Sequence, residues 1–144
     1  MKLEDILNEW DRDCNIDRLE ISNESLDISK LHNKYLRIMT AESVLLRSTT
    51  QEYNRLYKLK WEYYLGHLDD DILKEYNWEP NRLKILRQDV SIYLDSDSDL
   101  QKLKSRQDLQ KEKIAALDSI MKSISNRGFQ IKNYIEYEKF RVGA

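Results

Sequence analysis

The chain has 144 residues, of which 40% are hydrophobic and 35% charged, and its net charge is −2. This length fits one soluble domain, and no apolar stretch approaches the roughly 18 to 20 residues of a membrane span, so we expect no membrane contact. The 3 glycines and 1 proline leave few places for tight turns, which favours long helices. The single cysteine, Cys14, cannot form an internal disulfide and fits a reducing cytoplasm.

Charge is arranged in blocks along the chain. Residues 1–29 have a net charge of −6, residues 30–65 of +4, residues 66–79 of −4 and residues 100–144 of +5. Such blocks are a weak indication of an anion-binding face, because many helical proteins alternate charge without a ligand.

The first third of the chain predicts a short helix followed by a long one. Residues 3–10 place apolar side chains at helical spacing, at Leu3, Ile6, Leu7 and Trp10. Residues 25–65 contain neither glycine nor proline, and their apolar side chains follow a heptad pattern at Leu31, Tyr35, Ile38, Leu45, Leu56, Leu59 and Tyr63. A helix of about 35 residues would be about 50 Å long. It needs a partner helix or another subunit to cover its apolar face.

The end of this helix, from Arg55 to Gly66, concentrates cations and aromatic rings. Bases stack on rings while phosphates meet cations, so this composition suits a single-stranded nucleic acid. The alternative, which composition alone favours, is a helix end whose aromatic side chains belong to the core. Gly66 is placed to end the helix as a C-terminal cap, and the acidic turn at residues 69–71 is more typical of a solvated turn than of a metal site.

The middle of the chain is less regular. Apolar residues alternate with polar ones around Val90, Ile92 and Leu94, which predicts a short β-hairpin or an extended arm within residues 81–99. The aspartates and serines of residues 95–99 are suited to cap the last helix.

That last helix has a second heptad pattern, at Leu103, Gln107, Gln110, Ile114, Leu117, Met121 and Ile124, and the same frame continues at Ile131 and Ile135. We predict that Ile114, Leu117, Met121, Ile124, Ile131 and Ile135 carry homo-oligomerisation, with the two glutamines as a polar layer that sets register. Gly128 marks either a bend or a close approach of two helices, or a break between two helices.

Catalytic signatures are missing from the sequence. There is no Gly-rich phosphate loop, no Ser or Cys nucleophile beside a His, and no zinc-ligand spacing. We therefore expect a protein that is not an enzyme and that needs no metal and no cofactor.

Three stretches carry a resemblance to a known family: MKLED at residues 1–5, KLKWEYYLG at residues 58–66 and RGFQIKNYI at residues 127–135. In order, spacing and overall length they resemble the UvsY family of recombination mediators from T-even-type phages. The resemblance implies a non-enzymatic protein that binds single-stranded DNA, forms a hexameric or heptameric ring, and works in the cytoplasm of the infected bacterial host. Its implied partners are a RecA-like phage recombinase and the phage single-strand-binding protein.

The family's DNA-binding motif falls on Lys58 and Lys60. At position 60 this sequence has lysine where the family has arginine, so the charge is kept but the planar guanidinium, which can form paired hydrogen bonds, is lost. Trp61 also departs from the family pattern and offers stacking instead. On a helix, residues 58 and 60 point about 200° apart, so they cannot line one narrow groove. The predicted DNA-binding set is Arg55, Tyr57, Lys58, Lys60, Trp61 and Tyr64.

The sequence thus predicts a mainly α, ring-forming homo-oligomer, with one helical domain over residues 1–144. Within it, residues 1–99 are expected to form the DNA-binding portion and residues 100–144 the oligomerisation portion. The rival hypothesis is a coiled-coil scaffold that binds no nucleic acid, since it explains the heptads and the scarcity of glycine equally well.

Overall fold

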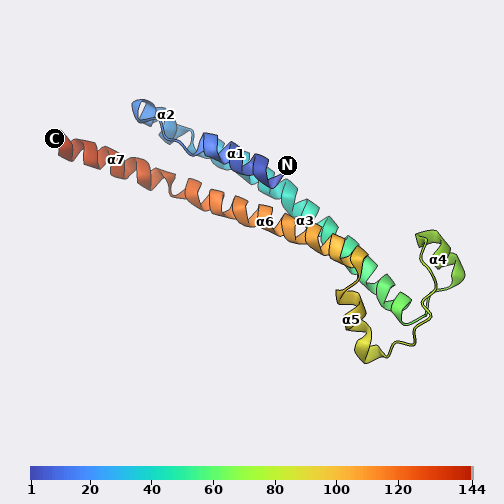
Figure 1. Ribbon diagram of the computed structural model, residues 1–144. Helices are drawn as coiled ribbons and strands as arrows, with labels where there is room; N and C mark the ends of the chain where they lie inside the picture. Colours follow the sequence, from blue (N-terminus) through green and yellow to red (C-terminus); the bar gives the residue numbers. More distant parts are fainter. Residues whose placement is uncertain (144) are drawn as a thin grey trace. The chain divides into compact units, whose positions relative to one another are not determined.

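A computed structural model describes residues 1–143, and no strand occurs among them (Figure 1). The α-helices are α1 Leu3–Asp13, α2 Ile21–Leu26, α3 Ile28–Tyr64, α4 Asp70–Tyr76, α5 Val90–Asp95, α6 Ser98–Ser125 and α7 Arg127–Arg141. Short 3-10 turns occupy Arg18–Glu20 and Arg87–Asp89. Within the described part, no helix is both long and apolar enough to cross a membrane. The long helices expected from the scarcity of glycine are confirmed.

The helices form two compact units, each with its own core. Unit 1 consists of Met1–Leu45 and the chain from Gln110 onward, and unit 2 is Leu46–Leu109. Helices α3 and α6 each contribute one part to unit 1 and the other part to unit 2. The functional division predicted at residue 100 is a separate matter from this structural one and stays a prediction.

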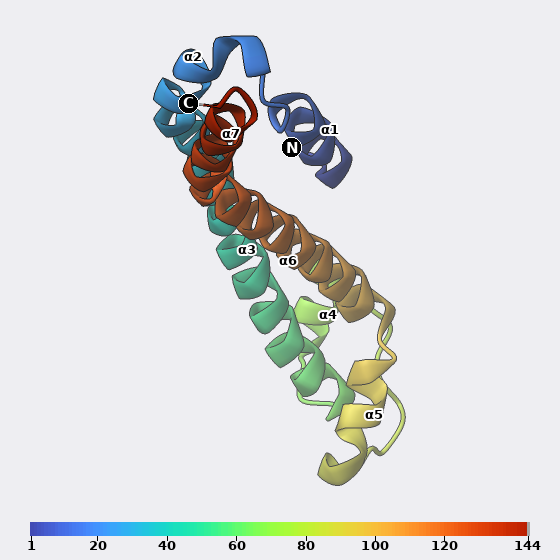
Figure 2. The same ribbon diagram turned by 90° about the vertical axis from the view of Figure 1, so that its left-hand side faces the viewer.

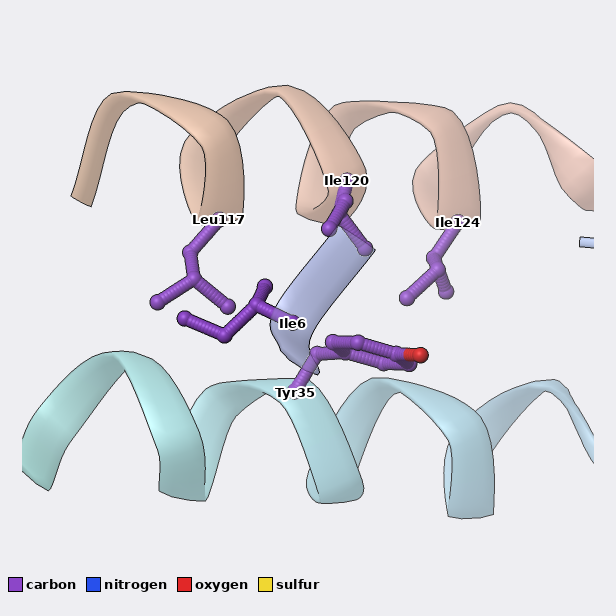
Figure 3. Packing of buried hydrophobic residues seen from close by; sticks show 5 residues of the cluster. All are labelled: Ile6, Tyr35, Leu117, Ile120 and Ile124. Atoms are coloured by element: carbon purple, nitrogen blue, oxygen red, sulfur yellow. The ribbon is translucent and has the colours of Figure 1, made fainter. Parts of the chain in front are cut away.

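The core of unit 1 is formed where α1, α3 and α6 meet. Figure 3 shows Ile6 of α1 and Tyr35 of α3 facing three aliphatic side chains of α6, which are Leu117, Ile120 and Ile124. All five side chains are buried, and burial of an aliphatic side chain of this size stabilises the fold by roughly 1.5 to 3 kcal/mol. Helix α2 lies against α7 in the same unit (Figure 2). The partner that the long helix requires is therefore supplied, in unit 1, by the chain itself.

A buried polar layer also joins α3 to α6 in unit 1. Gln110 donates a short hydrogen bond to the Glu42 carboxylate and another, of 2.8 Å, to its backbone oxygen. The Met1 ammonium and Lys113 lie 3.1 and 3.5 Å from the same carboxylate. Burial alone would raise the pKa of Glu42, but these donors and cations hold it below its usual value. Gln110, one of the two glutamines in the second heptad pattern, thus finds its partner in Glu42 of the long helix.

Unit 2 is built around the end of α3, α5 and the start of α6. Val90, Leu94 and Leu100 are buried there, and side chains of α3 pack against them, among them Leu56, Trp61 and Tyr64. The β-hairpin or extended arm predicted for residues 81–99 is wrong, because Val90 and Leu94 are four residues apart on a helix and share its buried face. Ile92 lies between them in sequence and is 66% exposed. The buried residues therefore follow the spacing of a helix and not the two-residue period of a strand.

The glycines act differently at the helix ends. Gly66 has a φ of +74°, and the amides of Gly66 and His67 donate to the carbonyls of Tyr63 and Glu62, which is the Schellman C-cap that ends α3. Between α6 and α7 the helix breaks at Asn126, so Gly128 lies inside α7 with open space beside it. The helices do break here, but at Asn126, two residues before Gly128, and no neighbouring atom lies close to Gly128.

We predict opposite effects of alanine at these two glycines. Gly66→Ala places a Cβ in a left-handed conformation and should destabilise the protein by about 1 kcal/mol. Gly128→Ala meets no neighbouring atom and removes the entropy cost of glycine in a helix, so it should stabilise by up to about 0.5 kcal/mol. Urea unfolding of both variants measures the difference; equal midpoints would contradict the assigned cap.

Candidate nucleic-acid interface

The six predicted binding residues occupy two sides of the last turns of α3. Arg55, Tyr57 and Lys58 are exposed, whereas Lys60 is 95% buried and Trp61 and Tyr64 are partly buried. The helical rotation of about 100° per residue separates Lys58 from Lys60 by about 200°, whereas Tyr57 lies about 60° from Lys60, at the margin of the buried side. The structure therefore brings Lys60, Trp61 and Tyr64 together in unit 2 and leaves Arg55, Tyr57 and Lys58 in solvent.

Lys60 is held by two carboxylates. Its Nζ lies 3.1 Å from Oδ2 of Asp97 and 3.0 Å from Oδ2 of Asp99. The same ammonium lies over the Trp78 ring, 4.0 Å from its centroid, and 5.5 Å from the centroid of the Tyr63 ring. Its charge is compensated inside unit 2, so Lys60 presents no free cation to a phosphate in this conformation.

Asp97 connects the end of α3 to the start of α6. Its Oδ1 accepts the backbone N–H of Leu100 at 3.0 Å and so caps α6. Its Oδ2 accepts the Tyr64 hydroxyl at 2.6 Å in addition to the Lys60 ammonium. Burial alone would raise the pKa of Asp97, but the bonds from Tyr64, Leu100 and Lys60 hold that pKa below its usual value. Burial and the Asp97 carboxylate raise the pKa of Tyr64, so its hydroxyl stays a donor.

The segment after α4 covers this cluster. The Tyr63 hydroxyl donates to the Glu79 carbonyl at 2.7 Å, and the Asn81 amide donates to the Tyr64 carbonyl at 2.8 Å. Trp78 stacks on Tyr76, with ring centroids 4.9 Å apart and planes at 25°. These contacts hold the indole over Lys60.

Sequence reasoning missed the partners of Lys60. Asp97 and Asp99 were expected only as candidates for capping, and Trp78 was not considered. A cation and acids 37 and 39 positions apart give no sequence signal without knowledge of the fold. The sequence did indicate a helix cap within the run of alternating aspartates at residues 95–99. Asp97 of this run caps α6, as predicted.

The exposed side of α3 keeps the features of a nucleic-acid contact. Within residues 1–143, neither Arg55 nor Lys58 has an acidic group at ion-pairing distance, and the Tyr57 ring in the same turns of α3 is 37% exposed. Cations without a counter-charge attract phosphates, and an accessible ring offers a stacking surface. In the same described range, no three His, Cys, Asp or Glu side chains are grouped to hold a metal ion.

We predict that Lys60 matters for stability and Lys58 does not. Lys60→Met leaves the buried Asp97 carboxylate without its cation and should cost about 3 kcal/mol of unfolding free energy. Lys58→Met removes an exposed charge and should change it by less than about 0.5 kcal/mol. Chemical denaturation measures both, and adding Asp97→Asn to Lys60→Met should restore part of the loss. Equal losses for the two lysines would mean that Lys60 is not buried as described.

Comparisons with known proteins relate nearly the whole chain to one family. The family described as "Recombination, repair and ssDNA binding protein UvsY" matches residues 9–144. The sequence matches none of the curated proteins with which it was compared. Among solved structures, the recombination mediator protein UvsY of bacteriophage T4 in lattice type II has a TM-score of 0.87 and 21% identity, covering 99% of this chain and 98% of that one. The same T4 protein in lattice type IV gives a TM-score of 0.86 and 21% identity, with 97% and 99% covered.

Proposed function

Because the chain belongs to the UvsY family of recombination, repair and single-stranded-DNA-binding proteins, we propose that it is a recombination mediator that binds single-stranded DNA through the exposed side of α3. It would promote loading of a RecA-like recombinase onto DNA covered by single-strand-binding protein. Work of this kind places it in the cytoplasm of an infected bacterium. The observation that supports the proposal is the pair of uncompensated cations, Arg55 and Lys58, one turn apart on α3, with the accessible ring of Tyr57 in the same turns.

The two motif lysines have different parts in this proposal. Lys58 contacts phosphate directly, and Arg55 does the same one turn away. Lys60 and Tyr64 act through Asp97, because they hold the end of α3 against α6 and thereby fix the backbone that presents Lys58. Trp61 packs in the core of unit 2 and supports the same helix end. Lys60, Trp61 and Tyr64 are therefore proposed as positioning residues.

We predict a charge-specific effect of Lys58 on DNA binding. Each phosphate contact to a single strand contributes about 0.7 to the slope of log K against log salt concentration, so Lys58→Ala should lower that slope by about this amount. Fluorescence anisotropy with labelled oligo-dT at several salt concentrations measures it. Lys111→Ala, which removes an exposed lysine of α6 in unit 1, is the matched control. A parent protein that does not bind oligo-dT would favour the scaffold hypothesis.

Homo-oligomerisation is proposed through α7. Of the residues predicted to carry it, Leu117 and Ile124 lie in the core of unit 1, Met121 packs against that core, and Ile131 is 3% exposed. Ile114 is partly buried and Ile135 is 38% exposed. The most exposed large apolar side chains of α7 are Phe129, Tyr137 and Phe140, which are 69%, 61% and 83% exposed.

These three rings share one face. At about 100° per residue they fall within about 80° of one another around the helix axis, opposite the buried Ile131. A row of exposed aromatic side chains marks an association surface. We propose that copies of the chain assemble through this face, as a hexameric or heptameric ring, while the Leu117 group stabilises each subunit.

We predict that assembly and subunit folding can be separated. Phe129→Ser with Phe140→Ser should reduce the particle mass in analytical ultracentrifugation and leave the circular dichroism spectrum unchanged. Leu117→Ala should instead destabilise the subunit by about 2 to 5 kcal/mol, because it opens a cavity in the core. A double serine variant that keeps the parent's mass would move the assembly contacts away from α7.

A further inference from the structure

A pair of aromatic rings leads from the exposed side of α3 toward α6 within unit 2. The rings of Tyr53 and Tyr57 are neighbours, with centroids 6.0 Å apart and planes at 37°. The Nζ of Lys104, on α6, lies 6.0 Å from the centroid of the Tyr53 ring. Tyr57 is the accessible ring that precedes Lys58 in α3, so two neighbouring rings, Tyr57 and Tyr53, lie between two cations, Lys58 and Lys104.

A cavity opens beside Tyr53 at the end of this series. Its volume is about 140 Å³, and its walls are Tyr53, Leu94, Asp95, Leu100, Gln101 and Lys104. One aromatic ring and two leucines offer flat apolar contact, whereas a carboxylate, an amide and an ammonium offer hydrogen bonds at the edges. This combination suits a planar heterocycle with polar edges, because such a group stacks on one face and bonds through its rim.

The charge of Lys104 is available to a ligand. Its nearest acidic atom is Oδ1 of Asp108, at 3.8 Å, and both side chains are about half exposed. An exposed pair at this separation is weak and is readily exchanged for another anion. Lys60 differs in both respects, because it is buried and has two carboxylates within 3.1 Å.

We propose that the bound single strand continues from Lys58 and Tyr57 across Tyr53 onto α6, where Lys104 contacts a phosphate and the cavity beside Tyr53 receives one unstacked base. This inference rests on the proposed single-strand binding and adds residues that neither the motif nor the heptad patterns indicate. The occupant is nucleic acid because the series has two rings that can stack on bases and, at its two ends, cations that can contact phosphates.

The phosphate contact is tested with two lysines of the same helix. Lys102 is also exposed, but it lies about 160° around α6 from Lys104 and so cannot reach the same strand. Lys104→Ala should weaken oligo-dT binding several-fold and lower the salt slope by about 0.7, whereas Lys102→Ala should leave both at the parent's values.

The base site is tested with oligonucleotides that lack bases. Tyr53→Leu should weaken binding by about 5-fold to 100-fold, and Tyr53→Phe, which keeps the ring, should stay close to the parent. An oligo-dT with abasic positions should bind the parent more weakly than intact oligo-dT, but the Tyr53→Leu variant should distinguish the two strands less. Thermal unfolding of each variant separates a loss of fold from a loss of stacking.

The outcomes separate this inference from the function on which it rests. If the parent protein fails to bind oligo-dT, the proposed function is overturned. If the parent binds and Lys58→Ala lowers the salt slope, but Lys104→Ala behaves like Lys102→Ala, only the extension onto α6 is overturned. If Tyr53→Leu, at unchanged stability, discriminates abasic from intact strands as the parent does, the cavity holds no base.

Discussion

The Asp97 carboxylate is the group on which the organisation of unit 2 depends. One oxygen caps α6 through Leu100, and the other receives the Tyr64 hydroxyl and the Lys60 ammonium from α3. A buried carboxylate is tolerated only when its charge and its lone pairs are satisfied, and here donors from two helices are needed to satisfy it. The requirement fixes where the end of α3 lies against the start of α6, and therefore which residues of α3 remain outside.

That constraint separates two lysines that look alike in the sequence. Lys60 is buried, forms ion pairs with the aspartates at the start of α6 and is covered by Trp78, while Lys58 remains in solvent. The same physical rule operates in unit 1, where Glu42 is buried against Gln110 and Lys113. In each unit a buried charge fixes the register of α3 against α6. If one helix slid along the other, Glu42 in unit 1 and Asp97 in unit 2 would lose their partners.

The division between core and surface also decides how assembly and folding are distributed. Side chains at the heptad positions of α6 are used within the subunit, since Leu117 and Ile124 contact Ile6 and Tyr35. The aromatic face of α7 is left outside because its opposite face, at Ile131 and Arg127, is the one that is buried. A substitution in the α6 core lowers the stability of the subunit, whereas a substitution on the exposed aromatic face of α7 changes only its association with other molecules.

The sequence by itself determined the helical class, the long central helix, its end at Gly66 and the candidate caps of the last helix, because these depend on local propensity and on periodicity that one segment contains. It indicated polar positions, Gln107 and Gln110, within the heptad pattern of α6, but that Gln110 meets Glu42 of α3 was decided by the packing of the two helices. It failed at residues 81–99, where Val90, Ile92 and Leu94 of a short helix imitate strand alternation although only Val90 and Leu94 are buried. Which of two neighbouring lysines would be buried was decided only by tertiary structure, since the partners of Lys60 lie 37 and 39 positions away and their meeting depends on the packing of two helices and a loop.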